Sequence, residues 1–216
     1  MIENGFIAGL YRLSEWVMKL AYANILWLFF SVVGGVVFGL GPATAGLFAV
    51  SRKMVMGADE IPVFRIFWSV YRKEFKRANI LFLILISMGL LLYFDHRFFL
   101  SQQGLIIDIV RYLILGLFLV YFLVLLFIFP LFVHYQMKLF HYFRSAVIFA
   151  IMQPFITILM ALGCYFIYEI LLFFPGLIPF FCSSLFSYLL MKLAYISFSK
   201  IERREENKKQ VIEEQL

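Results

Sequence analysis

The chain of 216 residues is strongly apolar: 64% of its residues are hydrophobic, only 15% are charged, and the mean hydropathy is +0.94. A water-soluble domain cannot keep that much apolar side chain off its surface, so the composition excludes one and indicates a protein surrounded largely by lipid. The net charge of +6 comes from basic residues that flank apolar segments. That distribution is typical of membrane-protein loops and argues against a nucleic-acid-binding surface, which needs a basic domain face.

Apolar segments long enough to cross a bilayer occur about five times along the chain. A helix needs about 20 apolar residues to cross the hydrocarbon core, and the charges divide the sequence into candidate spans at residues 21–40, 79–94, 105–133, 146–174 and 177–198. The sequence therefore predicts an all-α fold, a polytopic membrane helix bundle of about five transmembrane helices. These helices form a single domain of residues 1–200, which is followed by a charged cytoplasmic tail at residues 201–216.

The segment ahead of the first span, residues 2–20, has the pattern of an amphipathic helix. Apolar side chains from Ile2 to Leu20 recur on one helical stripe, while Arg12, Glu15 and Lys19 lie on another face. We expect an N-terminal interfacial helix that lies on the outer leaflet or docks on the extracellular surface of the protein itself.

The basic residues predict the orientation of the chain in the cell membrane. Of the 19 Lys and Arg residues, residues 41–78 hold seven, residues 134–145 hold two, and the segment after residue 198 holds five. Because cytoplasmic loops carry an excess of Lys and Arg, these three segments are predicted to be cytoplasmic. Five crossings then place the N-terminus outside the cell and the C-terminus in the cytoplasm.

The loop between the first two spans is predicted to be helical. Gly41 and Pro42 are expected to break the first helix, Gly57 is expected to end a second one, and a third is expected to start at Asp59 or Glu60. From residue 64 onward, aromatic side chains form one stripe and basic side chains occupy the flank and back. We expect this basic amphipathic helix to bind lipid headgroups at the inner leaflet or an acidic partner protein. The predicted binding residues are Arg65, Phe67, Trp68, Arg72, Phe75 and Arg77.

Catalytic motifs are missing from the sequence, which has no nucleotide-binding loop, nucleophile elbow or zinc-protease helix. The chain is therefore predicted to be non-enzymatic, without a cofactor or metal. A weak cluster of Asp95, His96 and Asp108 near the outer face is the one candidate for an enzyme of lipid or cell-wall metabolism. Inside the spans, Arg111 and Glu169 are predicted to form an intramembrane ion pair, because ionisable groups in a membrane need a partner.

A series of short motifs resembles the YesL family of bacterial membrane proteins, which is typical of Firmicutes such as bacilli. The resemblance covers roughly residues 39–81, and the rest of the chain matches mainly in its pattern of spans. The motifs are Gly41-Pro42-Ala43-Thr44-Ala45-Gly46, Arg52-Lys53, Asp59-Glu60, Pro62-Val63-Phe64, Phe67-Trp68 and Phe75-Lys76-Arg77-Ala78-Asn79.

The resemblance implies a function in carbohydrate uptake, since members of this family are often encoded among carbohydrate importer and glycoside-degrading genes. It implies an accessory subunit that contacts the permease subunits of an ATP-binding-cassette (ABC) importer of oligosaccharides. The alternative is a small transporter or channel in its own right. Such a protein could form a homo-oligomer with a solute path between its protomers. The expected partners are therefore membrane lipids and permease subunits, with no nucleic acid.

Overall fold

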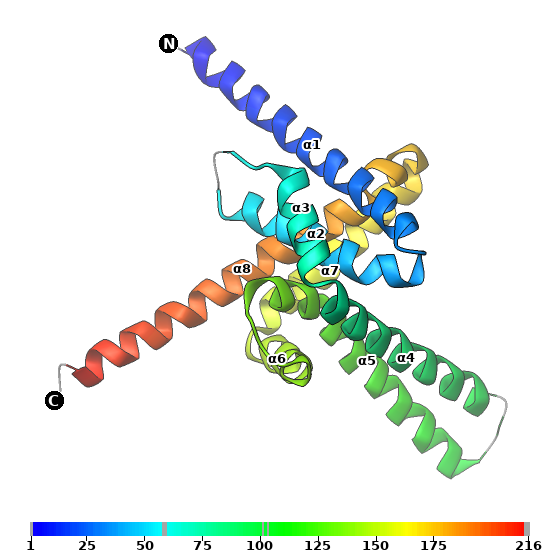
Figure 1. Cartoon of the computed structure of the whole chain (residues 1–216). Coiled ribbons are helices and arrows are strands. Elements are labelled where there is room, and N and C mark those ends of the chain that lie inside the picture. The colour runs from blue at the N-terminus through cyan, green and yellow to red at the C-terminus, as the bar shows by residue number, and fades with distance from the viewer. Residues whose placement is uncertain (1, 58–59, 101, 103, 214–216) are drawn as a thin grey trace.

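The computed structural model is entirely helical over the residues that it describes, with no β-strand among them (Figure 1). The described residues are 2–57, 60–100, 102 and 104–213, and within them side chains are described from residue 9 to residue 200. The helices are α1 (Ile2–Val33), α2 (Val37–Val55), α3 (Val63–Lys73), α4 (Phe75–Leu100), α5 (Leu105–His134), α6 (Leu139–Met152), α7 (Pro154–Phe173), the short 3₁₀ helix η1 (Pro175–Leu177) and α8 (Ile178–Glu213).

Five helical segments in the described part of the chain are long and apolar enough to cross a membrane, which confirms the predicted fold class. The segments are Gly9–Val33, Phe75–Leu100, Leu105–His134, Pro154–Phe173 and Pro175–Lys200. Most of their surface is exposed apolar side chain, as lipid-facing helices require. The predicted tail continues α8 as a helix to Glu213, and its side chains lie outside the described residues.

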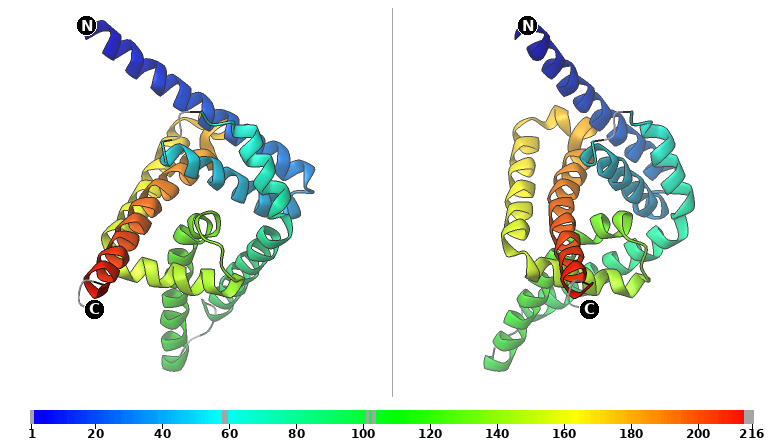
Figure 2. Two further views of the ribbon diagram at one scale, coloured as in Figure 1. Left: turned by 60° about the vertical axis from the view of Figure 1, so that its left-hand side comes forward. Right: turned by 90° about the vertical axis from the view of Figure 1, so that its left-hand side faces the viewer.

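Helix α2 lies at the centre of the structure and packs against α1, α3, α4, α5 and α8. The N-terminal part of α1, the C-terminal part of α8 and the α4–α5 hairpin extend away from this centre in three directions (Figure 1). Helices α7 and α8 pack antiparallel to each other beside it (Figure 2). The long helices therefore diverge around a short buried helix (Figures 1 and 2).

Small residues explain how α2 packs on so many neighbours. Gly41 and Gly46 leave room for a close approach of other helices: a Cβ at residue 41 would lie 2.8 Å from the carbonyl oxygen of Ala78 in α4, and one at residue 46 would lie 3.1 Å from the Phe67 ring in α3. Ala43 and Ala45 are fully buried. Small side chains of this kind let helix backbones come together in a membrane.

The predicted helix break at Gly41 and Pro42 is wrong, because both residues lie buried inside α2. The chain reverses one to two turns earlier, where α1 ends at Val33 and Gly35 and Val36 have φ values of 77° and 59°. Two successive residues with positive φ end an α-helix. Pro42 removes one backbone hydrogen bond near the start of α2, a loss that the packing of α2 on five neighbours offsets.

The boundaries of two predicted spans also differ from the structure. The expected interfacial helix and the first span, residues 21–40, are joined in one continuous helix, α1, which ends at Val33. The fourth span, residues 146–174, is divided at Gln153 into α6 and α7. Gln153 has φ −132° and ψ 66° because the residue before a proline is disfavoured in the helical conformation, and Pro154 then begins α7.

Polar side chains in the core join helices that are distant in sequence. Asn24 of α1 donates to the carbonyl oxygen of Pro179 at 2.7 Å and accepts from the backbone N–H groups of Ser183 and Ser184 in α8. The hydroxyls of Ser51 in α2 and Ser187 in α8 are 2.8 Å apart. These contacts fix α1 and α2 against α8 by hydrogen bonds between buried groups.

Candidate functional site

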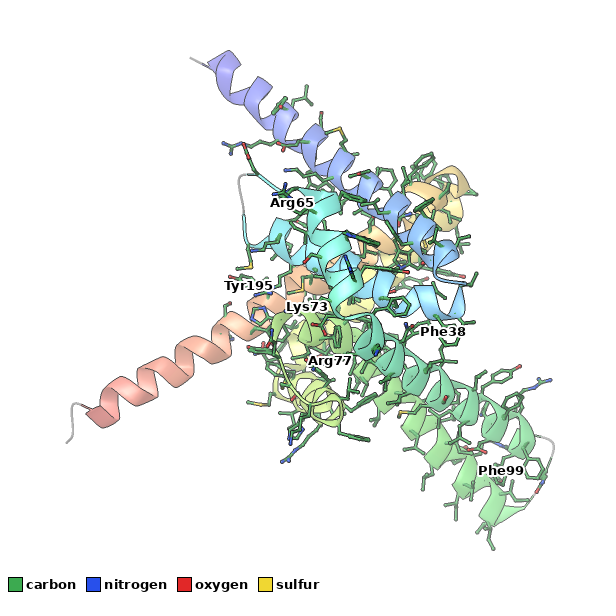
Figure 3. All side chains as sticks on the ribbon, viewed as in Figure 1. Phe38, Arg65, Lys73, Arg77, Phe99 and Tyr195 are labelled. Atoms are coloured by element: carbon green, nitrogen blue, oxygen red, sulfur yellow. The ribbon has the colours of Figure 1, made fainter. Side chains whose placement is uncertain are left out.

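A group of exposed basic side chains extends along α3 into the start of α4. We call Arg65, Arg72, Lys73 and Lys76 the cationic face; all four are exposed. Figure 3 shows Lys73 and Arg77 near the junction of α3 and α4, and Arg65 toward the other end of α3. None of the four forms an ion pair with another described residue. Their charges are therefore available to an external anionic group.

The aromatic stripe opposite the cationic face fixes α3 to the rest of the protein. Phe67 is fully buried, and the Tyr71 ring lies tilted against the Phe30 ring of α1, with a centroid distance of 5.1 Å. The Tyr71 hydroxyl donates to the carbonyl oxygen of Phe30 at 3.2 Å, and burial raises the pKa of Tyr71, so this donor stays protonated. Contacts with α1 and α2 thus hold α3 in one orientation.

The structure divides the predicted binding residues into two groups. Arg65, Trp68 and Arg72 are exposed, as the prediction requires. Phe67 belongs to the core, and its burial excludes a direct contact with a partner. Phe75 is half-buried, with its ring edge-on to Tyr71. The periodicity of the sequence predicted the apolar stripe, which we assigned to lipid or a partner protein. A helix face that packs inside the protein has the same pattern, so periodicity alone could not distinguish the two.

Arg77, the last of the predicted binding residues, has an internal structural role. Its guanidinium donates to the carbonyl oxygen of Met137 at 2.7 Å and forms an ion pair with Glu74 at 3.3 Å. Arg52 makes a similar contact from α2, because its Nη1 donates to the carbonyl oxygen of Val133 at 2.9 Å. Arg52 therefore bonds a carbonyl group in the last turn of α5, which the helix leaves without a partner, and Arg77 bonds a carbonyl group in the connection after α5.

A pocket of about 280 Å³ lies between these two arginines, and we call it the interhelical pocket. It is bounded by the second half of α2, by α3, by the start of α4 and by the end of α5 with the connection that follows. Four basic side chains and one carboxylate line it. The lining residues are Ala49, Arg52, Lys53, Ile66, Val70, Lys73, Glu74, Arg77, Phe132, Val133, His134, Tyr135, Gln136 and Tyr142.

Only a weak pattern in the sequence indicates this pocket. Arg52 and Lys53 occupy the last turn of α2, and Arg72 and Lys73 occupy the last turn of α3. Basic residues at helix C-termini are favoured by the helix dipole in any protein, so each pair alone indicates nothing more. The folding of α2 against α5 brings Arg52 toward Arg77, and that contact between distant segments is not readable from local periodicity.

The predicted ion pair between Arg111 and Glu169 is wrong. Arg111 pairs with Asp108 at 3.1 Å and donates to the carbonyl oxygens of Phe99 and Gln102, both at 3.1 Å. These contacts tie the start of α5 to the end of α4, in the hairpin that extends away from the rest of the protein (Figure 1). Glu169 is exposed on α7 and has no ion pair among the described residues. Because Asp108 is engaged by Arg111, the cluster with Asp95 and His96 carries no catalytic proposal.

Comparison with known proteins gives a consistent family but no activity. The family described as "Protein of unknown function, DUF624" matches residues 20–96, a region that includes α2, α3 and the cationic face. Three proteins of Bacillus subtilis (strain 168) are similar over nearly their whole length, and all three are described as uncharacterized. They are YesV (39% identical over 194 residues, 90% of this chain and 93% of the relative), YteU (36% over 203 residues, 94% and 91%) and YesL (35% over 202 residues, 93% and 95%). No solved structure matches the chain.

Proposed function

The chain belongs to the YesL family of membrane proteins, and we propose that it is a non-enzymatic accessory subunit of an oligosaccharide importer of the ABC class. In this proposal it contacts the permease subunits through the cationic face. The link to carbohydrate uptake rests on the resemblance described above. The contact surface rests on the arrangement of α3.

The main support for this proposal is that α3 is held in a fixed orientation and presents basic side chains without ion-pair partners among the described residues. The cationic face has no ion pair among the described residues, while Phe67 and Tyr71 on the opposite side of α3 are buried in the core. A rigid, charged surface of this kind suits an acidic partner, because complementary charge gives specificity and a fixed helix loses little conformational entropy on binding.

We further propose that the cationic face lies on the cytoplasmic side of the membrane. The excess of basic residues in segments 41–78 and 134–145 supports this placement. The contacts of Arg52 with Val133 and of Arg77 with Met137 also support it, because they bring these two basic segments together. The C-terminus, with five further basic residues, belongs on the same side.

A crosslinking experiment tests the accessory function. The tagged protein is crosslinked mildly in its native membrane and purified, and the recovered proteins are identified by mass spectrometry. We expect permease subunits among them, and we expect the double substitution Arg65→Glu with Arg72→Glu to reduce their recovery at least fivefold, because reversed charge repels an acidic surface. Arg77 is left unchanged, since its internal hydrogen bonds would confuse the result.

The matched control is the double substitution Lys138→Glu with Arg144→Glu. It makes the same change in charge at two exposed residues of the other basic segment, and it should leave the recovery of permease subunits unchanged. Equal loss in both variants would show a general effect of charge. Recovery of this protein alone, as a stable oligomer, would contradict the accessory function and make solute flux in liposomes the next assay, as a transporter or channel requires.

The position of the N-terminus needs a separate test. The count of five crossings places it outside the cell, but Arg12 and Lys19 of α1 share a pocket with Met54 and Ile61, in and after the last turn of α2. This neighbourhood favours the same membrane side for both segments. In that arrangement α2 returns the chain after α1 and is a further crossing beside the five long apolar segments. We expect cysteines introduced as Gly9→Cys and Met56→Cys, in a variant without the two native cysteines, to react with an impermeant maleimide from the same side. Labelling from opposite sides would restore the extracellular N-terminus.

A further inference from the structure

We propose that the interhelical pocket binds a phosphate group. This inference goes beyond the accessory function and does not depend on it, because Arg65 and Arg72, which the crosslinking test changes, do not line the pocket, and Lys73 alone belongs to both the pocket and the cationic face. Four cations, Arg52, Lys53, Lys73 and Arg77, face one carboxylate, Glu74. The pocket therefore carries a surplus of positive charge that an anion would neutralise.

Two of the four cations are held in place before any ligand arrives. Arg52 and Arg77 are fixed by the carbonyl oxygens of Val133 and Met137. The Nε atom of Arg52 is buried and has no hydrogen-bond partner in the described structure. A buried donor without an acceptor costs free energy, so an anion that supplies the acceptor is favoured. Planar guanidinium groups held in this way are well suited to phosphate oxygens.

The other two cations supply charge without an ion-pair partner among the described residues at the same pocket. Lys53 and Lys73 come from α2 and α3, and neither forms an ion pair with a described residue. Glu74 does not neutralise them, because it is engaged by Arg77 at 3.3 Å. A ligand that meets two arginines and two lysines is best held by more than two acceptor oxygens and more than one negative charge. Phosphate has both, whereas a carboxylate has two oxygens and a single charge.

The dimensions and the apolar part of the lining define the class of ligand. A volume of about 280 Å³ holds a phosphate group together with a small substituent such as glycerol. Ile66, Val70 and Phe132 provide apolar surface beside the charged groups. The ligand is therefore either the headgroup of an anionic phospholipid or a small soluble phosphate compound, which share the same phosphate chemistry.

Binding of inorganic phosphate and of phosphatidylglycerol tests the proposal on the full-length protein. In the first arm, the detergent-purified protein is titrated with inorganic phosphate against chloride at matched ionic strength, and the thermal midpoint is followed. In the second arm, the protein is reconstituted in phosphatidylcholine nanodiscs with or without phosphatidylglycerol, and retained lipid is measured by native mass spectrometry. Each arm uses the wild type, the pocket variant Lys53→Gln with Lys73→Gln, and the control variant Arg65→Gln with Lys76→Gln.

We expect the pocket variant to bind phosphate or phosphatidylglycerol at least tenfold more weakly, while the control variant binds as the wild type does. Both variants lose two charges, and the substituted side chains make no internal hydrogen bond or ion pair among the described residues, so both should fold. Binding in the phosphate arm alone would identify a soluble ligand, and binding in the lipid arm alone would identify a headgroup. Absence of binding in both arms, or equal weakening in the two variants, would overturn the proposal, and neither result would affect the crosslinking test of the accessory function.

Discussion

The substitution Gly39→Ala is expected to destabilise the protein by about 3 kcal/mol, because it places a methyl group against the backbone of α1. An added Cβ would lie 2.8 Å from the carbonyl oxygen of Phe30 and still closer to that of Ser31. Neither oxygen can move freely: the first accepts hydrogen bonds from the N–H of Gly34 and the hydroxyl of Tyr71, and the second accepts from the N–H of Val36. The clash therefore acts on the chain reversal that joins α1 to α2.

The control for this prediction is Gly116→Ala in α5, where an added Cβ meets nothing within 4 Å. Alanine is the better helix former by about 1 kcal/mol, so this variant should be as stable as the wild type or slightly more stable. Unfolding in detergent micelles, followed by far-UV circular dichroism, measures both effects. A Gly39→Ala protein that unfolds at or above the wild-type midpoint would show that α1 and α2 do not pack as closely as the structure indicates.

Hydropathy predicted the spanning helices well because it measures the property that a bilayer selects. The third span, predicted at residues 105–133, coincides with α5 to within one residue. The second, predicted at residues 79–94, is shorter than α4 (Phe75–Leu100), because the helix continues through polar residues at both ends. Charge marks where a segment leaves the lipid, whereas a helix ends only where its backbone hydrogen bonding ends.

Helix α2 is the part of the fold that local sequence patterns did not predict. Its glycines, alanines and the pair Arg52 and Lys53 lower its mean hydropathy, so its first residues were assigned to the preceding span and the rest to a loop. Small residues are compatible with a turn and with close helix packing alike. The choice between these depends on the surfaces of α1, α4 and α8 that meet α2, and those contacts join residues far apart in the chain.

The same limitation applies to the candidate site. The positions of Arg65 and Arg72 on an exposed face follow from helical periodicity and were predicted. The role of Arg77 was not, because its partner is the carbonyl oxygen of Met137, 60 residues away. The predicted ion pair of Arg111 was wrong for a related reason. Glu169 was chosen because it was expected at the same depth in the membrane, but Asp108, three residues from Arg111 on the same helix, is the carboxylate that pairs with it.

The substitution Asn24→Leu is expected to destabilise the protein by about 3 kcal/mol, because it removes three hydrogen bonds between α1 and α8. The amide of Asn24 contacts both the carbonyl oxygen of Pro179 and the N–H of Ser183, two groups that stand in the i, i−4 relation within α8. Leucine has a similar volume, and the backbone groups of α8 can still bond each other within the helix. The loss would therefore come from the three hydrogen bonds between the helices and not from a change in packing. A single interhelical hydrogen bond in a membrane contributes on average about 0.6 kcal/mol, and three that converge on one buried side chain contribute more.

Tyr22→Phe, two residues earlier in α1, is the matched control for Asn24→Leu. Its side chain is 43% exposed, so removing the hydroxyl should change the free energy of unfolding by less than about 0.5 kcal/mol. Both variants are compared with the wild type by equilibrium unfolding in mixed micelles. If Asn24→Leu is as stable as Tyr22→Phe, the amide does not hold α1 to α8, and the packing of α1 across α8 must rest on apolar contacts alone. If Asn24→Leu is strongly destabilised, a single polar side chain in α1 determines where the first and last spanning helices meet.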